Sequence, residues 1–366
     1  MGSDNLDGLR IAFLAGTLGQ GGAERQLMHM LTALRTQGAR PSVLSLTRGE
    51  YWEEPIQQMG IPVTWVGESS SQLFRLQRVM AELGRLRPQI LQSCHCFTNV
   101  YVAAACLATG TRDVGAIRSD TRQTLSGRFA AMRLWSLRHL RSIAVNSRAS
   151  LQSAIEFGVR PNRLFLLPNV VDTQQFQPAE GVAADEAVVR LLAVGRLSAE
   201  KRFDRLLRTV AAIPPEMRLK VRVTIAGDGP LRAVLEKQSS DLGLREAVRF
   251  LGAQVDIAPL YRDADLLALT SDSEGSPNVV LEAMASGLPV LGTRTGGVGE
   301  LVEHGVTGLL ARPNDEVGLA VALETLVRNG GLRRRMGARG RDRAVQSYSR
   351  VSLPRSLGNL YRMALQ

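Results

Sequence analysis

The chain has 366 residues, of which 45% are hydrophobic and 22% charged, and it carries a net charge of +11. This length is comfortable for two domains, and the composition is that of an ordinary globular protein rather than a disordered one. The longest apolar stretch, residues 100–107, is too short to span a bilayer, and three cysteines, an odd number, argue against a disulfide framework.

The excess of basic over acidic residues indicates which kinds of molecule the protein binds. Eight arginines and only two aspartates lie in residues 112–148. No nucleic-acid motif accompanies them, so we expect no nucleic-acid partner. A phosphate-bearing acceptor or an anionic membrane surface fits this stretch, and so does a solvated arginine-rich surface.

The N-terminal half alternates strand-like and helical segments. The apolar run 9–15 predicts a first strand rather than a signal peptide, and a glycine-rich loop and a helix-periodic segment, 23–34, follow it. Further strand-like runs lie at 41–46, 63–66, 89–93, 114–117 and 143–145, with helical stretches at 73–86 and 98–107. This order predicts a doubly wound α/β domain with ligands at the carboxyl ends of parallel strands.

The glycine loop alone would also allow a nicotinamide-dependent dehydrogenase. However, the loop matches G-x-G-x-x-G poorly, and the next predicted strand ends Leu-Ser-Leu-Thr, without an acidic residue for a cofactor ribose. A dehydrogenase is therefore the weakest alternative.

Candidate polar residues follow two of these strands. His95 comes after the strand 89–93, and Arg118 and Asp120 come after the strand 114–117. Strand alternation would put Cys94 and Cys96 on one face and His95 on the other, so we predict two small buried thiols and no metal site. Residues 119–140 interleave apolar and arginine side chains, which predicts an amphipathic helix that is either interfacial or core-facing.

A second α/β unit begins near residue 188, after a polar, alanine-rich linker at 177–186. We predict strands at 189–194, 221–226 and 248–252. Arg196 and Lys201 share the loop after the first of these strands, where two fixed cations would neutralise a leaving diphosphate. Gly227 lies in a glycine turn after the second strand.

The stretch 271–290 contains the most informative carboxylates. It follows the apolar run 266–269, with Ser276 as the predicted N-cap of a helix that Gly287 ends. The free N–H groups of this helix start suit a diphosphate. Glu274 would accept hydrogen bonds from sugar hydroxyls, and Glu282 from a ribose diol. We interpret the nearby pairs Asp263-Ala-Asp265 and Asp272-Ser-Glu274 as structural, without a metal.

Three motifs together resemble family 4 retaining glycosyltransferases, which have the GT-B fold. They are Gly21-Gly-Ala-Glu-Arg25, the segment from Gly195-Arg-Leu to Lys201-Arg-Phe-Asp204, and Glu274-x7-Glu282. The resemblance implies two Rossmann-like doubly wound domains that face each other across a cleft. The acceptor-side domain would span residues 1–172, the nucleotide-sugar-binding domain 173–345, and a helix crossing back to the first domain 346–366.

The resemblance also assigns roles to individual residues. It implies catalytic roles for His95, Arg196, Lys201 and Glu274, and acceptor-side contacts for Arg118 and Asp120. The donor would be bound by Gly21, Gly22, Gly227, Gly275, Ser276, Asn278, Val279 and Glu282. Two positions depart from the family pattern: Cys-His-Cys replaces His-x-His or His-Glu around His95, and Val170 replaces a glycine.

The expected function is transfer of a hexose-type sugar from a nucleotide-diphospho-sugar to a glycan or lipid-linked acceptor, by same-face attack and without a metal or other cofactor. For the donor we expect UDP rather than GDP. The expected location is the cytoplasm. Peripheral attachment to the inner face of the cell membrane is an additional hypothesis. A sugar-nucleotide epimerase, a phosphorylase and a non-catalytic sugar-nucleotide-binding protein are alternatives.

Overall fold

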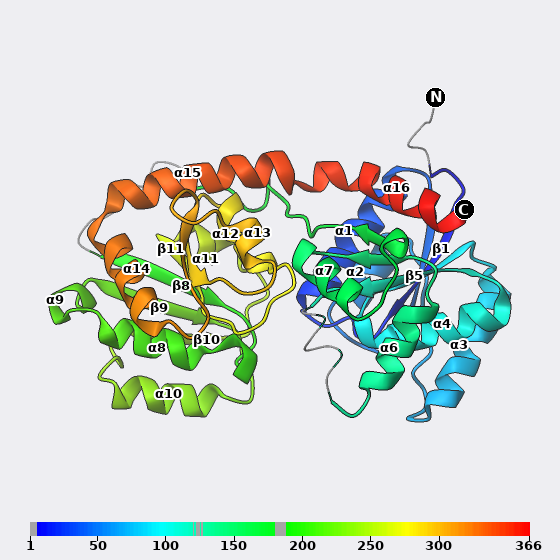
Figure 1. The fold of residues 1–366 in the computed structure, drawn as a ribbon, viewed down its shortest axis with the longest axis horizontal. Helices are drawn as coiled ribbons and strands as arrows, with labels where there is room; N and C mark the ends of the chain where they lie inside the picture. The colour runs from blue at the N-terminus through cyan, green and yellow to red at the C-terminus, as the bar shows by residue number, and fades with distance from the viewer. Residues whose placement is uncertain (1–5, 120, 122–124, 126, 180–187) are drawn as a thin grey trace. The chain divides into compact units, whose positions relative to one another are not determined.

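The computed structural model describes residues 6–119, 121, 125, 127–179 and 188–366. Asp120, a predicted acceptor-side residue, lies outside these ranges. The chain divides into two compact units, residues 1–169 with 351–366, and residues 170–350. Each unit is an α/β domain built on a parallel sheet, which confirms the predicted fold class (Figure 1).

The first unit contains a seven-stranded sheet in the order β3-β2-β1-β4-β5-β6-β7. The strand order reverses between β1 and β4, and open α/β sheets bind ligands at the carboxyl edge of such a topological switch point. The strands are β1 (Arg10–Ala15), β2 (Arg40–Ser45), β3 (Val63–Trp65), β4 (Ile90–Ser93), β5 (Arg112–Ile117), β6 (Ile143–Val145) and β7 (Leu164–Leu166).

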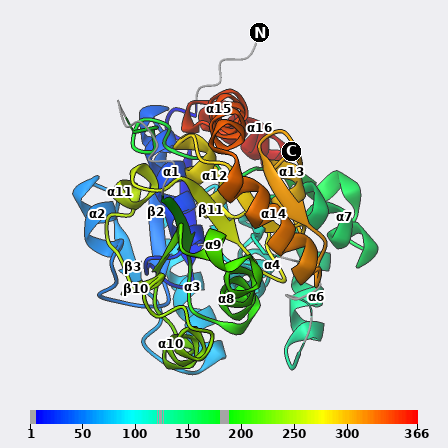
Figure 2. The same ribbon diagram turned by 90° about the vertical axis from the view of Figure 1, so that its left-hand side faces the viewer.

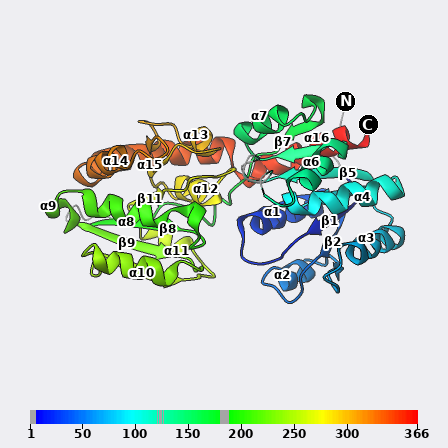
Figure 3. The same ribbon diagram turned by 60° about the horizontal axis from the view of Figure 1, so that its bottom comes forward.

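Helices cover both faces of this sheet, as a parallel sheet requires. Helices α1 and α16 lie on one side, and α3, α4 and α6 lie on the other (Figures 1 and 3). The buried Tyr361 hydroxyl of α16 donates to Gln92 Oε1 of β4 at 2.6 Å, which anchors the end of the chain to the first unit. The helices are α1 (Gly22–Thr36), α2 (Glu53–Gln58), α3 (Gln72–Leu86), α4 (Asn99–Thr109), α6 (Ala130–His139), α7 (Arg148–Glu156) and α16 (Leu353–Leu365).

The predicted helix over 119–140 is interrupted. Helix α6 begins at Ala130, and residues 127–129 before it form a turn with Gly127 at φ +79°. Its apolar side chains divide between core and surface: Leu137 is buried, whereas Phe129 and Trp135 are exposed. No helix within the described ranges is long and apolar enough to cross a membrane.

The second unit has a six-stranded sheet in the order β10-β9-β8-β11-β12-β13. Its order reverses between β8 and β11, so the loops after these two strands lie at a second topological switch point. The strands are β8 (Val189–Val194), β9 (Val221–Ala226), β10 (Val248–Gly252), β11 (Leu266–Leu269), β12 (Val290–Thr293) and β13 (Gly308–Ala311).

Alternate residues of these strands point to opposite faces and form two apolar clusters. The first contains residues of α8, α10 and α14, and the second contains residues of α11, α12, α13 and α15 (Figure 2). The bounds are α8 (Phe203–Ala212), α9 (Pro215–Arg218), α10 (Arg232–Asp241), α11 (Ala258–Arg262), α12 (Asn278–Ala285), α13 (Val298–Leu301), α14 (Glu316–Arg328) and α15 (Gly330–Ser347).

Helix α12 begins one residue later than predicted. Pro277, not Ser276, is its N-cap, because Pro277 keeps an extended backbone (φ −71°, ψ 120°) and Asn278 is the first helical residue. Gly287 follows the helix with φ +74°, as its predicted role at the helix end requires. The final helix also begins later than expected, at Leu353, after a short 3-10 turn over Arg350–Ser352.

Candidate active site

The loops after β8 and β11 bring together two residues that were predicted to be catalytic. Lys201 Nζ donates to Glu274 Oε1 at 2.7 Å, and Ser271 Oγ donates to the same oxygen at 2.7 Å. The Glu274 side chain is 9% exposed and that of Lys201 is 27% exposed. Within the described part of the chain Glu274 Oε2 accepts no hydrogen bond, so it retains its capacity to accept from a ligand hydroxyl.

Arg196 lies at the start of the same loop and is exposed. No described acidic side chain pairs with its guanidinium. An arginine in the loop that also carries Lys201, without an acidic partner among the described residues, provides a fork of donors for a phosphate group. The predicted cation pair is therefore present in one loop, with Lys201 held by Glu274 and Arg196 open to solvent.

Glycines hold these loops close to one another. A Cβ at Gly227 would lie 1.9 Å from the carbonyl oxygen of Gly195, and a Cβ at Gly296 would lie 1.7 Å from the carbonyl oxygen of Glu274. The Gly297 N–H also donates to the Gly275 carbonyl at 2.9 Å. Side chains at these positions would displace the backbone that carries Glu274, so the glycines position the site.

The predicted donor-binding residues Gly275, Ser276, Asn278 and Val279 form the entry to α12, directly after Glu274. Glu282 lies one turn further along the helix and is only 2% exposed. Its Oε2 accepts a hydrogen bond from the Tyr261 hydroxyl at 2.8 Å. The structure thus brings Glu282 to the same helix, with its carboxylate buried and bound by a tyrosine that the sequence did not reveal.

Beneath the site, the buried guanidinium of Arg205 ties β11 to α8. It donates to the Thr270 carbonyl at 2.8 Å and to Asn314 Oδ1 at 3.0 Å, and it pairs with Asp272 at 2.7 Å. Asp265 pairs with Arg190 at 3.1 Å. These contacts support the structural interpretation of the two aspartates.

In the first unit, His95 contacts a carboxylate that was not predicted as a site residue. The Gly16 N–H donates to His95 Nδ1 at 3.1 Å, so Nδ1 is an acceptor and the ring proton of neutral His95 lies on Nε2. Nε2 lies 3.0 Å from Glu24 Oε1 and donates to it. Thr17 Oγ1 donates to the same carboxylate oxygen. The loop after β1, the first turn of α1 and the end of β4 are joined through this contact.

Two opposing effects act on the pKa of Glu24. Burial raises it, but the hydrogen bonds from His95 and Thr17 and the charge of His95 lower it, and the resulting pKa lies below 4.5. Glu24 is therefore a carboxylate at neutral pH. A Cβ at Gly21 would lie 2.1 Å from Glu24 Oε2, which explains why glycine precedes the helix here. The sequence feature that could have identified Glu24 as a site residue is its position in the Gly-Gly-Ala-Glu-Arg motif.

The predicted acceptor-side residue Arg118 has a partner within this unit. Arg118 donates to Asn169 Oδ1 at 3.2 Å, and burial lowers its pKa. The strand alternation predicted for Cys94 and Cys96 is wrong, because β4 ends at Ser93 and Cys96 begins a short 3-10 helix. Burial raises the pKa of both thiols, that of Cys96 to about 12.

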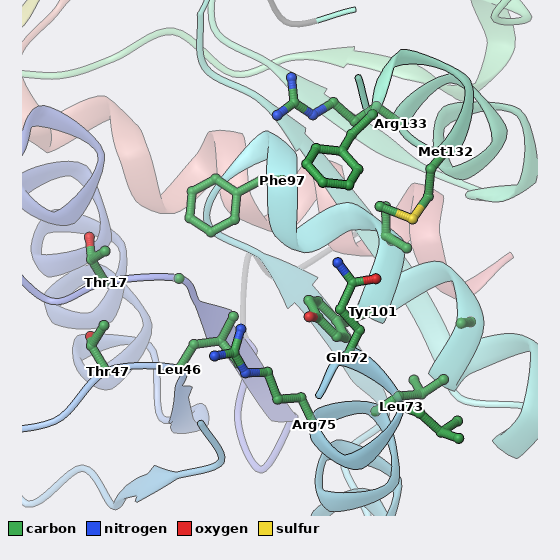
Figure 4. A pocket seen from close by; sticks show the side chains of 15 residues that line it. Thr17, Leu46, Thr47, Gln72, Leu73, Arg75, Phe97, Tyr101, Met132 and Arg133 are labelled. Carbon is green, nitrogen blue, oxygen red and sulfur yellow. The ribbon is translucent and has the colours of Figure 1, made fainter. Parts of the chain in front are cut away.

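A cavity of about 700 Å³ opens beside the Glu24–His95 pair (Figure 4). Its lining comes from the loop after β1, from the end of β2 and from α3, α4 and α6. The Phe97 ring belongs to this lining and stacks on the His95 ring, with 5.1 Å between centroids. Sequence reasoning missed this cavity, because its residues come from five separate segments.

Comparisons with known proteins bear on both units. Residues 20–175 match the family described as Glycosyltransferase Family 4, and residues 175–343 match Glycosyl transferases group 1. The chain is 27% identical over 350 residues to the lipopolysaccharide core biosynthesis glycosyltransferase LpsE of Rhizobium meliloti, covering 91% of this chain and 93% of that protein. It is 32% identical over 177 residues to the N-acetyl-alpha-D-glucosaminyl L-malate synthase of Bacillus anthracis, an alignment that spans 48% of this chain and 45% of the synthase.

The fold is also that of solved glycosyltransferases. The Anabaena protein Alr3699/HepE, solved in complex with UDP-glucose, superposes with a TM-score of 0.85 at 22% identity, covering 96% of this chain and 99% of the other. The lipopolysaccharide outer core galactosyltransferase WaaB superposes with a TM-score of 0.76 at 17% identity, covering 97% of this chain and 99% of the other. At these identities the likeness concerns the fold.

Proposed function

The chain is a glycosyltransferase with the GT-B fold, and we propose that it transfers a hexose-type sugar from a nucleotide-diphospho-sugar to a glycan or lipid-linked acceptor, with retention of configuration and without a metal ion. The observation that carries this proposal is the 2.7 Å contact between Lys201 and Glu274 at the switch point of the second unit. It joins a carboxylate that precedes α12 to a cation in the loop that also carries the exposed Arg196.

The proposed division of work follows from the chemistry of these groups. Arg196, Lys201 and the positive end of the α12 dipole stabilise the negative charge that develops on the leaving diphosphate. Glu274 Oε2 accepts hydrogen bonds from hydroxyls of the transferred sugar, while its Oε1 fixes the lysine. Two cations and a helix start can perform the charge neutralisation that a metal ion supplies elsewhere.

A same-face reaction suits this set of groups. Glu274 already binds Lys201 and Ser271, so its role is to orient the donor rather than to form a bond with the sugar. The departing diphosphate is then the base that takes the proton of the acceptor hydroxyl, and attack occurs on the face from which the diphosphate leaves. Retention of configuration follows from that geometry.

A uridine donor is supported by the structural neighbour. The Anabaena protein was solved with UDP, with UDP and glucose, and with UDP-glucose. The relatives differ in the acceptors that their names imply, from lipopolysaccharide core to L-malate and D-inositol 3-phosphate. We therefore propose UDP as the leaving group, and the acceptor needs separate evidence.

Ligand-induced stabilisation and product analysis test the proposal together. UDP at high excess should raise the melting temperature by mass action, and EDTA should not change this shift. UDP-glucose should release UDP, and Lys201→Met should abolish most of that release, whereas Lys237→Met, on exposed α10, should not. An EDTA-sensitive shift would contradict the metal-free site. Release of an altered UDP-sugar without UDP would favour an epimerase, and transfer with an inverted anomeric centre would contradict retention.

A further inference from the structure

The cavity of the first unit is unusual for a sugar-binding site. Its lining is mainly apolar and includes Phe129 together with Leu73, Phe97, Tyr101 and Met132, the last four of which are labelled in Figure 4. Leu73 is 65% exposed, and Phe97 and Phe129 are each 45% exposed. Exposed apolar side chains gathered around one hollow mark a binding site more often than isolated ones do.

The charged residues that line the cavity are both basic. They are Arg75 and Arg133, and none of the described lining residues is acidic. The Arg75 Nε donates to the Ser69 carbonyl at 2.6 Å, which holds the arginine along the cavity wall. A ligand that fills this cavity therefore meets apolar surface and positive charge together, the complement of an amphiphile with an anionic group.

Two residues that line the cavity also contact the Glu24–His95 pair. Phe97 stacks on His95 with one face and borders the cavity, and Thr17 both lines the cavity and donates to Glu24. A Cβ at Gly16 would lie 2.1 Å from the Phe97 ring, so the loop after β1 packs directly against this wall. A ligand in the cavity thus lies next to the loop that follows β1 at the switch point.

We propose that this cavity binds the apolar chain of an amphiphilic, phosphate-bearing acceptor, such as a lipid-linked phosphate. The inference rests on the proposed transferase function and names the acceptor class. Few polar side chains besides the arginines line the cavity: Thr17, Thr47, Gln72 and the Tyr101 hydroxyl. A free oligosaccharide would leave most of the lining without a polar partner, whereas a hydrocarbon chain covers it and removes it from water.

Direct binding of dodecyl phosphate, measured by isothermal titration calorimetry below its critical micelle concentration, tests this class. We expect saturable binding with one molecule per chain, and at least tenfold weaker binding of dodecyltrimethylammonium, which has the same chain and the opposite charge. Inorganic phosphate alone should not compete. Equal affinity for the two amphiphiles would contradict the role of the arginines, and competition by phosphate would show a simple anion site instead.

Variants on α4 and α6 locate the binding. Ala104→Trp fills the cavity from α4 and should weaken dodecyl phosphate binding at least tenfold, whereas Leu107→Trp, an exposed position on the same helix that does not line the cavity, should leave it unchanged. Phe129→Ser removes exposed apolar surface without touching the core and should weaken binding several-fold. Unchanged affinity in Ala104→Trp and Phe129→Ser would overturn the inference.

The two proposals can fail separately. Binding of UDP and hydrolysis of UDP-glucose to UDP and glucose, with water as the acceptor, test the transferase, and neither measurement needs the natural acceptor. If UDP release occurs but dodecyl phosphate does not bind, the acceptor inference fails and the transferase stands. If dodecyl phosphate binds as expected but UDP neither binds nor is released, the transferase fails, and with it the claim that the bound amphiphile is an acceptor.

Discussion

The two sheets each place a carboxylate and a basic side chain at the switch point, yet the two pairs differ in their access to a ligand. In the first unit Glu24 and His95 are 7% and 12% exposed, and both ring nitrogens of His95 are bonded within the unit. In the second unit Lys201 is 27% exposed, and Glu274 keeps one oxygen without a partner among the described residues. We call the Glu24–His95 pair closed, because little of it is exposed, and the Lys201–Glu274 pair open, because a ligand can reach it.

Residues at equivalent positions of the two Rossmann-like units therefore need not have the same function. In the closed pair both ring nitrogens of His95 are used, one by the Gly16 N–H and the other by Glu24, and the pair therefore fixes the backbone of the loop after β1. An open pair can exchange solvent for a ligand. The geometry favours a positioning role for Glu24 and His95 and a ligand-binding role for Lys201 and Glu274. The catalytic role of His95 stays a prediction.

The largest expected effect follows from Glu274→Gln. The amide still accepts a hydrogen bond from Lys201 but loses the charge that holds the lysine and orients the donor sugar. We expect UDP release from UDP-glucose to fall about 10²–10³-fold, the scale of losing one preorganised electrostatic contact. UDP itself should still bind, because the change does not touch Arg196.

The matched variant in the other unit sharpens the comparison. Glu24→Gln keeps an acceptor for His95 and Thr17 and should reduce UDP release less than Glu274→Gln does. A larger loss in Glu24→Gln would reverse the assignment, since it would place ligand chemistry on the closed pair.

The second prediction concerns stability. Glu24→Ala leaves the His95 Nε2 proton and the Thr17 hydroxyl without their acceptor in a buried site, which costs about 1–3 kcal/mol of unfolding free energy. All three tryptophans, Trp52, Trp65 and Trp135, belong to the first unit, so tryptophan fluorescence during urea unfolding follows that unit alone. Glu274→Ala, in the second unit, should leave the fluorescence transition in place. An equal shift in both variants would show that the two units unfold together.

Most of the fold was predictable because hydrophobic runs define the strands. The strand ranges 189–194, 221–226, 248–252 and 266–269 were predicted to the residue. Predictions were wrong where local backbone geometry decides the outcome, as at Pro277, whose extended ψ delays α12, and at Gly127, where a turn interrupts a long amphipathic pattern. Periodicity does not contain that information.

The site was predictable to a smaller extent. The sequence motifs identified Lys201 and Glu274 as site residues. Their contact joins residues 73 positions apart, so only the folded structure reveals it. The partners of Glu282 and His95 were missed for the same reason, since Tyr261 and Glu24 reach them from other elements. The cavity was not predictable, because it depends on which faces of α3, α4 and α6 remain uncovered.

The third prediction uses pH to isolate the charge of Glu24. Its pKa in the folded chain is below the ordinary 4.5, so ionised Glu24 stabilises the folded state above that value, and this contribution is lost as the pH falls through the folded pKa. The difference in unfolding free energy between the wild type and Glu24→Gln should be present at pH 7 and fade below pH 4.5. Tryptophan fluorescence again reports the first unit, and a difference that grows in acid would contradict the lowered pKa.

The smallest expected effect concerns the thiols beside the closed pair. Burial raises the pKa of Cys94 and Cys96, so almost no reactive thiolate exists at neutral pH. Iodoacetamide at pH 7.5 should therefore label the folded chain far more slowly than the chain unfolded in urea, as counted by mass spectrometry. The double variant Cys94→Ser with Cys96→Ser should retain UDP release, because the Glu24–His95 contact does not involve either sulfur. Rapid labelling of the folded chain would mean that this end of β4 opens to solvent, and the first switch point would then be no more closed than the second.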